Sequence, residues 1–383
     1  MPTIHLPIGG STAARTLGCP AWLGRAAKTP KGGSSSAADQ GTLFHEVMEG
    51  YYRDDKEFKD QLGVTTYGEY TFNTDMLNEL VLPAFEAAEQ VFDTYDIQEL
   101  MIEPFVQYIP DVAGGSIDIL GVSGDGKTVV ILDWKGGHGH VRAEDNKQLI
   151  FYALSAAVDN TLGAFDIKKV EKIVGVIIQP KISHKPDVWE FTKAEVNAFE
   201  DELIKAIDSS ELESPPASSG SHCTWCPAAP YCPEKKLLAR SALVLSKDNS
   251  EQLAEAMAMV DEVEAWAKAV RKAAHSALDR GGKVAGWKLV AKRASRVWAD
   301  AEAVETKIRN AKKIKLTEGF EVKLKSPAKI EKLCKEKGIP FQPFADMAVM
   351  YSSGNTMAAE KDKRPAIDVK EIPDILVKMV AES

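Results

Sequence analysis

The feature that most restricts the fold of this chain is a pair of apolar segments that each carry an acidic residue. Residues 116–122 and 128–134 both have the composition of buried strands, and residues 123–126 form a turn between them. Asp118 lies in the first strand and Asp133 near the end of the second. A carboxylate among apolar residues is costly unless it is paired or binds a metal. We therefore predict a hairpin that brings Asp118 close to Asp133.

The residue two places after Asp133 is a lysine. Alternate residues of a strand share one face, so Lys135 is predicted to point the same way as Asp133. Two carboxylates are the hard oxygen ligands that Mg²⁺ or Mn²⁺ prefers, and a metal there could activate water beside the lysine. A structural ion pair between Asp133 and Lys135 without any chemistry is the alternative, and isolated Asp-x-Lys patterns usually have that role.

The segments around this hairpin indicate an α/β fold. We expect a small mixed sheet with helices packed on it. The predicted strands and helices are a helix over 41–53, a helix over 76–92 that Pro83 interrupts, a strand over 101–109, a helix over 143–158 and a buried strand over 172–179.

Four short motifs then occur in a fixed order along the chain: Gly-x-x-x-His at Gly41 and His45, Gly-x-x-Asp at Gly115 and Asp118, Asp-x-Lys at Asp133 and Lys135, and Gln-x-x-x-Tyr at Gln148 and Tyr152. With these motifs the sequence resembles the RecB-like branch of the PD-(D/E)XK nucleases, and the resemblance implies a restriction-endonuclease-like core.

The same resemblance implies a role for each motif residue. His45, Asp118 and Asp133 would ligate Mg²⁺ or Mn²⁺ with help from the carbonyl of Trp134, and Lys135 would be the catalytic lysine. Gln148 and Tyr152 would contact DNA or orient the site. Glu103 is either an auxiliary acid or a solvated residue at a strand edge. His138 and His140 follow in a glycine-rich loop that we expect to be exposed and mobile.

Cysteines form a second cluster, C-x₂-C-x₅-C, at Cys223, Cys226 and Cys232. The spacing alone indicates zinc, with Cys19 or His222 as the fourth ligand. RecB-like nucleases of the iron–sulfur type, among them the AddB helicase-nuclease subunit and CRISPR-associated relatives, have one cysteine before the nuclease motifs and three after them. That resemblance implies a [4Fe–4S] cluster on Cys19 and these three residues, with structural Zn²⁺ as the alternative. Cys334 is expected to be a lone thiol.

The C-terminal part differs in charge from the rest of the chain. We predict a nuclease core over 1–240, a long helix and linker over 241–282 that ends at Gly281-Gly282, and a basic accessory region and tail over 283–383. Residues 283–337 hold 16 Lys and Arg against 7 Asp and Glu, a net +9, whereas the whole chain carries −9. Trp287 and Trp298 lie in this segment, which could bind DNA or form a solvated surface.

These features predict a metal-dependent DNA nuclease. The sequence is also similar over most of its length to a phage-encoded family of unknown function. Because RecB-like cores with clusters mostly process ends, the resemblance implies an exonuclease in phage recombination or replication. A structure-specific endonuclease and a non-catalytic DNA-binding or assembly subunit are the alternatives. The partners expected besides DNA are a single-strand annealing protein, a helicase or a single-strand binding protein, and an oligomer is compatible with the sequence.

The chain has 383 residues without an 18-residue apolar run or a secretory pattern. We therefore expect no membrane and a cytoplasmic location, which for a phage protein is the cytoplasm of the bacterial host.

Overall fold

The computed structural model describes residues 6–30, 36–159, 169–244 and 250–288, and also the single residues 331, 332, 335, 338, 340 and 342. The chain divides into two compact units, Met1–Val290 and Ala291–Ser383. The first unit therefore contains every helix and strand named below. Most of the predicted basic region, with Trp298 and Cys334, lies outside the described residues.

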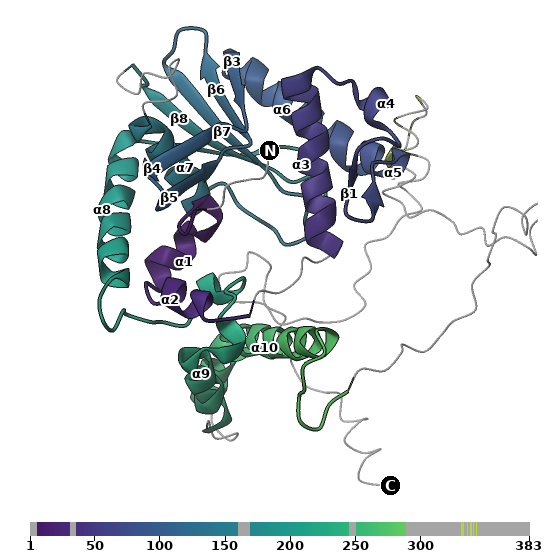
Figure 1. Ribbon diagram of the computed structural model, residues 1–383. Coiled ribbons are helices and arrows are strands. Elements are labelled where there is room, and N and C mark those ends of the chain that lie inside the picture. Colours follow the sequence, from purple (N-terminus) through teal and green to yellow (C-terminus); the bar gives the residue numbers. More distant parts are fainter. Residues whose placement is uncertain are drawn as a thin grey trace, which may run out of the picture. The chain divides into compact units, whose positions relative to one another are not determined.

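A five-stranded mixed sheet forms the centre of the first unit, in the order β3-β6-β7-β8-β9 (Figure 1). β7 and β8 are parallel, and the other neighbours are antiparallel. The strands are β3 (Ile97–Ile102), β6 (Ile119–Ser123), β7 (Thr128–Trp134), β8 (Lys172–Ile178) and β9 (Asp187–Phe191). The predicted hairpin is confirmed, because β6 pairs with β7 and Ile119 is opposite Leu132.

Helices cover both faces of this sheet, and the alternation within β7 shows how. Val130 and Leu132 join an apolar cluster with α3 (Ser36–Asp54) and α6 (Leu82–Thr94). Val129 and Ile131 join a second cluster with α7 (Lys147–Val158) and α8 (Lys193–Ser210). The strand is thus buried on both faces, which explains its near-continuous apolar sequence. The predicted α/β class, a mixed sheet flanked by helices, is confirmed.

The helix predicted over 76–92 is divided into three parts. A short α5 (Thr74–Met76) leads into the π-helical turn η2 (Leu77–Val81), and α6 follows. Pro83 lies in the first turn of α6 and has no N–H to donate, and its ring would clash with the carbonyl four residues earlier. The wider π turn accommodates that clash, so the interruption lies just before the proline.

The prediction of a single strand over 101–109 is wrong, because two strands occur there. The chain forms β3 and then β4 (Phe105–Ile109), with a break at Glu103-Pro104. The facing strand has a break too, between β5 (Ala113–Ser116) and β6. Pairing is Ile102 to Ile119 before the break and Phe105 to Ser116 after it, so the register is unchanged across the bend. One long hairpin therefore bends between two sheets, and the bend places Glu103 opposite Asp118.

Other predicted boundaries move by a few residues. α7 begins at Lys147 and not at Ala143, because the Asn146 side chain accepts a hydrogen bond from the N–H of Gln148 and caps the helix there. The long helix is α10 (Ser250–Asp279), and Gly281 beyond it has φ +77, as expected where a helix ends in a glycine. Within the described residues, no helix is both long and apolar enough to cross a membrane.

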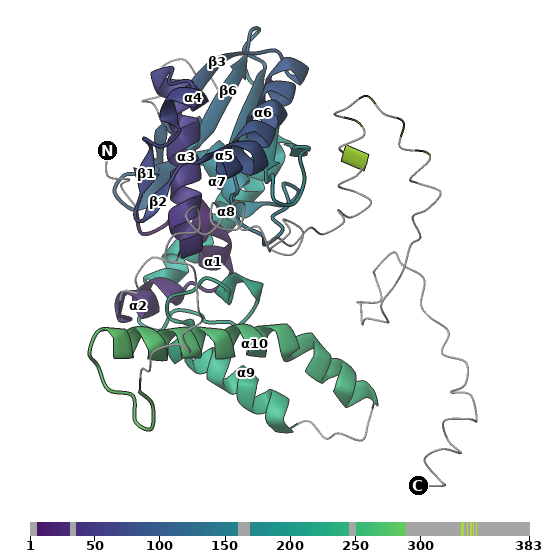
Figure 2. The same cartoon turned by 90° about the vertical axis from the view of Figure 1, so that its right-hand side faces the viewer.

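Shorter elements surround the sheet. They are η1 (Gly10–Thr12), α1 (Ala13–Gly18), α2 (Trp22–Ala27), α4 (Phe58–Gln61), β1 (Thr66–Tyr67), β2 (Tyr70–Thr71), η3 (Ser221–Cys223), η4 (Ala229–Tyr231) and α9 (Pro233–Val244). η4 and α9 both contact α10, and α1 contacts η3 (Figure 2). The N-terminal helices thus lie beside the segment that carries the later cysteines.

Candidate metal centre and cysteine site

Three side chains converge where the long β3–β6 hairpin bends. His45 comes from α3, Glu103 from the break between β3 and β4, and Asp118 from the facing break. Their potential ligand atoms all lie within 4.8 Å of one another, and no other His, Cys, Asp or Glu group among the described residues meets that criterion. Carboxylate oxygens and an imidazole nitrogen are suitable ligands for Mn²⁺, and the oxygens for Mg²⁺.

Glu103 has an unusual backbone conformation. Its φ is +52, and the other described non-glycine residues with positive φ are all aspartates, which tolerate this region better than glutamate. The Glu103 N–H donates to the Asp118 carbonyl at 3.1 Å, so the bend is tied across the hairpin. A strained backbone at a cluster of charged side chains is typical of a functional site.

Asp118 is fixed by two contacts. One carboxylate oxygen accepts a hydrogen bond from the backbone N–H of Trp134 at 2.6 Å, and the other lies 3.3 Å from Nδ1 of His45. The residue is only 8% exposed. The end of β7 therefore sets the position of the Asp118 carboxylate toward α3.

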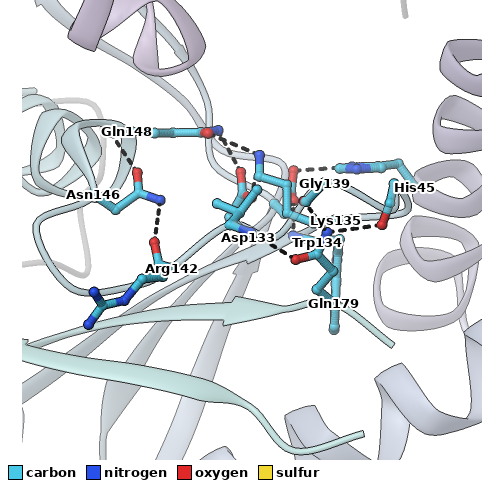
Figure 3. Close-up of polar contacts among 12 residues, drawn as sticks. His45, Asp133, Trp134, Lys135, Gly139, Arg142, Asn146, Gln148 and Gln179 are labelled. Carbon is cyan, nitrogen blue, oxygen red and sulfur yellow. Dashed lines mark hydrogen bonds and ion pairs between the residues drawn. The ribbon is translucent and has the colours of Figure 1, made fainter. Parts of the chain in front are cut away.

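Asp133 and Lys135 point to the same side of β7, as predicted, and meet Gln148 of α7 (Figure 3). Nζ of Lys135 lies 2.6 Å from Oδ2 of Asp133 and donates to Oε1 of Gln148 at 3.0 Å. Nε2 of Gln148 donates to Oδ1 of Asp133 at 2.5 Å. Asp133 is thus paired beside the three-ligand group and outside it. Its predicted role as a ligand, and that of the Trp134 carbonyl, stay predictions.

The crowding of charges shifts the pKa values of this cluster. Burial alone would lower the pKa of His45, but the carboxylates of Asp118, Asp133 and Glu103 together outweigh it and raise the pKa to about 9. Burial and the charge of Asp118 raise the pKa of Glu103 to about 8. Burial also raises the pKa of Asp133. At Asp118 burial acts in the same direction, but His45, the Trp134 N–H and Lys135 together outweigh it and lower the pKa. Several carboxylates in one buried place attract a cation.

Two glycines make close approaches possible around Tyr152. A side chain at Gly10 would overlap the Tyr152 ring at 2.6 Å, and one at Gly115 would lie 3.5 Å from it. The ring is therefore packed against the Gly-x-x-Asp motif. Burial and the charges of Asp133 and Asp118 raise the pKa of Tyr152, so the phenol keeps its proton at neutral pH.

All four predicted cysteines line one small cavity, although Cys19 is about two hundred residues from the others in sequence. A backbone hydrogen bond from Ala21 to the Pro216 carbonyl, 3.0 Å long, joins the two segments. His222 lines the same cavity, and a side chain at Gly18 would overlap its ring at 2.6 Å. His222 forms a hydrogen bond that helps to lower the pKa of the Cys19 thiol, against the effect of burial.

Cations surround the four sulfurs. Arg25 donates to Sγ of Cys232 at 3.1 Å, and the largely buried Arg15 and Lys235 line the cavity as well. Nε of Arg15 is buried without a hydrogen-bond partner within the described residues. Buried cations beside sulfur atoms fit an anionic group, such as a set of thiolates around a metal.

The spacing of the sulfurs bears on which metal they fit. A tetrahedral zinc site with bonds of about 2.3 Å would place its sulfurs roughly 3.8 Å apart. Among the described residues no three cysteine sulfurs lie within 4.8 Å of one another, since only the His45 group does. No three of these sulfurs are thus as close together as the ligands of a closed zinc site.

Comparisons with known proteins identify the family. Residues 5–365 match a family described as "Protein of unknown function (DUF2800)". The chain belongs to this family. It is also similar to a solved protein, SSO0001, with 11% identity over 58% of this chain and 95% of that one, at a TM-score of 0.21. So low a TM-score carries no argument about the fold.

The sequence pattern understated one residue and missed another. The sequence allows Glu103 to be either an auxiliary acid or a solvated residue at a strand edge, and the structure places it beside His45 and Asp118. The Glu-Pro pair was an available signal, because a proline interrupts a strand ladder. The sequence indicates only a strand end at Gln179, although this residue is 5% exposed and binds the loop after Lys135. A buried glutamine after an apolar strand was the signal there.

Proposed function

We propose that this protein is a metal-dependent DNA nuclease with a PD-(D/E)XK-type core, and that it acts as an exonuclease. The observation that supports the proposal is the meeting of a three-ligand group with an Asp–Lys–Gln set at one edge of the sheet. The ligands come from one face of the sheet and from its bent hairpin, whereas Gln148 comes from the other face. End processing is the first choice because RecB-like cores with clusters, which this chain resembles, mostly act on ends.

His45, Glu103 and Asp118 would hold Mg²⁺ or Mn²⁺, and the residues fit this role by their donor atoms and proximity. A metal here would supply charge neutralisation at the phosphate and a more acidic water. The protein fixes the three ligands before any metal arrives, through the Trp134 N–H and the bend. Asp133 is close enough to Lys135 to set the orientation of the lysine.

Lys135 is held so that part of its ammonium group stays available. An ammonium has three N–H donors, and at most two are taken up by the hydrogen bond to Gln148 and the ion pair with Asp133. The third can meet an oxygen of the reacting phosphate, or a water molecule, and stabilise the charge that develops there. The Asp133 carboxylate outweighs burial and raises the pKa of Lys135, so the group remains a cation.

The four cysteines would hold a [4Fe–4S] cluster with a structural role. The order of the four cysteines along the chain, which resembles iron–sulfur nucleases, and the surrounding cations support this choice, and no three of the sulfurs lie at zinc spacing. Cys19 follows α1, so the cluster would fasten the N-terminal helices to the segment after α8. Iron and sulfide analysis, with the visible absorbance of anaerobically purified protein, tests it. A colourless protein that contains one zinc ion would reverse the assignment.

The nuclease proposal is tested on linear end-labelled DNA and on closed circular DNA, with Mg²⁺ or Mn²⁺. We expect loss of linear DNA only, and Lys135→Ala should lower the rate by about 10²- to 10³-fold, the usual cost of one stabilising donor. Lys127→Ala is the matched control, because Lys127 lies just before the opposite end of the same strand. It should cleave as the wild type does.

The other outcomes each have a definite meaning. Nicking of circles that depends on Lys135 would make the protein an endonuclease. DNA binding without cleavage, in protein that retains its iron, would contradict the enzyme and favour an assembly role. Equal cleavage by wild type and Lys135→Ala would show that the activity arises elsewhere.

A further inference from the structure

Two loops leave the sheet beside the metal centre. The glycine–histidine loop, residues 136–142, follows Lys135 at the end of β7, and the lysine loop, residues 180–186, follows β8. Because β7 and β8 are parallel, both loops emerge at the same edge. Gly136 also lies against α3, since a side chain there would be 3.5 Å from Cα of Gly41, one turn before His45.

Gln179 anchors the glycine–histidine loop. Its Nε2 donates to the carbonyls of Gly137 and Gly139 at 2.9 and 2.7 Å, and its Oε1 accepts from the Val141 N–H at 3.0 Å (Figure 3). Both amide hydrogens and the amide oxygen are thereby used on one loop. A loop that we expected to be mobile is thus tied to the sheet at three points.

The same residue starts the lysine loop through its backbone. The Gln179 carbonyl accepts from the N–H groups of Ile182 and Ser183 at 2.9 and 3.0 Å. The Ser183 hydroxyl then accepts from the Lys185 N–H at 3.0 Å. Both loops are therefore ordered from one buried residue next to the site.

The charge on these loops is one-sided. The fourteen residues contain no Asp or Glu, in a chain with 56 of them, and they include three of its seven histidines. Arg142 pairs with Glu144, but the side chains of Lys181 and Lys185 have no acidic partner within the described residues. His138, His140 and His184 are exposed, as are both lysines.

We propose that the two loops form a docking surface for the phosphate backbone of the DNA strand that enters the metal centre. The inference rests on the proposed nuclease function and specifies how its substrate is held. Cations on a fixed backbone suit phosphates, which position a strand without reading its sequence. Lys181 and Lys185 bind phosphates. The glycine–histidine loop follows β7, which lies between β6 and β8 in the sheet, and Gln179 is a positioning residue.

Salt-dependent binding tests the docking surface. Fluorescence anisotropy with labelled DNA in EDTA measures affinity without cleavage, over a range of salt concentrations. Each lost phosphate contact lowers the slope of log K against log salt by about 0.9 for duplex DNA, so Lys181→Ala/Lys185→Ala should lower it by about 2. Affinity near 0.1 M salt should fall about tenfold. Lys59→Ala/Lys205→Ala, on α4 and α8, removes the same charge away from the loops and should leave both values unchanged.

Gln179 is tested by the form of its kinetic defect. Gln179→Glu replaces the donor to two carbonyls with an acceptor, so the loop should lose its anchor. We expect KM for DNA to rise about tenfold and the salt slope to fall, with kcat changed less than threefold. A purely structural role would lower kcat and thermal stability while leaving the salt slope as it was.

Different results would contradict the nuclease function and the docking surface. Wild-type protein that neither binds nor cleaves DNA would overturn the nuclease function and this inference with it. Wild-type protein that binds and cleaves, together with a lysine pair variant that keeps the wild-type slope and affinity, would overturn the docking surface alone. If the two loops bound an acidic protein and not DNA, the lysine pair variant would likewise keep the wild-type slope and affinity.

Discussion

The metal centre and the cysteine site are built in different ways. The metal centre lies between two large apolar clusters, one on each face of the sheet, and its side chains extend from strands and helices that those clusters hold. The cysteine site has a small core of its own, formed by Cys19, Ala21 and Trp22. Its later cysteines lie in or next to the short 3₁₀ turns η3 and η4. Apolar burial can order the first site, but it has little to order the second.

This difference predicts how each site depends on its inorganic group. Burying apolar surface gives the sheet its stability whether or not a cation is bound. The turns around the cysteines bury little and are held by backbone hydrogen bonds and charged side chains, to which the proposed cluster would add four sulfur ligands. We infer that the metal centre is preformed for catalysis, and that the cysteine site needs its cluster in order to fold.

Removal of a cluster ligand should have the largest effect. Cys223→Ser should lose nearly all its iron, and with it a structural contribution that is on the order of 10 kcal/mol for known structural metal sites. The turns around η3 and η4 should then open, which limited proteolysis between residues 211 and 232 would detect. The sheet should keep its protection against hydrogen exchange, because its apolar clusters do not include the cysteines.

Cys334→Ser is the matched control, since it makes the same change at the cysteine predicted to be a lone thiol. It should retain iron and resist proteolysis. If Cys223→Ser were as protease-resistant as the control after losing its iron, the contrast between the two sites would be wrong.

Loss of a metal ligand should affect activity and leave the fold intact. Asp118→Asn should lower the cleavage rate by at least about 10²-fold, because a bound cation supplies several kcal/mol of charge stabilisation. The asparagine oxygen can still accept from the Trp134 N–H, so stability should change by less than about 2 kcal/mol. Cleavage assays and thermal melting of the same preparation measure both.

Asp125→Asn is the control for this variant. It makes the same substitution in the turn between β6 and β7, at the other end of β6 from Asp118. It should keep full activity. An Asp118→Asn protein that unfolds would show that the metal centre is no more preformed than the cysteine site.

The sequence predicted the parts of the metal centre that lie within regular elements. β7 has the predicted bounds, and its alternation placed Lys135 beside Asp133. Composition could not show the bend, because a left-handed backbone at Glu103 is set by pairing across the hairpin and not by local preference. The anchoring by Gln179 depends on a loop forty residues away in sequence, which a local pattern does not contain.

The smallest effect concerns the link between the cysteine site and α10. Lys235, whose side chain is 3% exposed and which lines the cysteine cavity, lies 2.8 Å from Glu262 of α10. Glu262 also accepts from Ser219 at 2.9 Å. Glu262→Ala would leave a buried lysine charge without its carboxylate, at a cost of about 3 kcal/mol. Lys235→Met should cost less, because Glu262 is partly exposed and keeps its bond to Ser219.

Replacing both partners sharpens this test. Lys235→Met/Glu262→Leu removes both charges and should be close to wild type in stability, since apolar pairs often match buried ion pairs. Hydrogen exchange of the α10 amides, compared with that of β7, measures the effect where it is expected. If only the α10 amides lose protection, the ion pair stabilises the cysteine region independently of the sheet. An equal loss in β7 would instead mean that the two regions unfold together, and that the cysteine site contributes to the stability of the sheet.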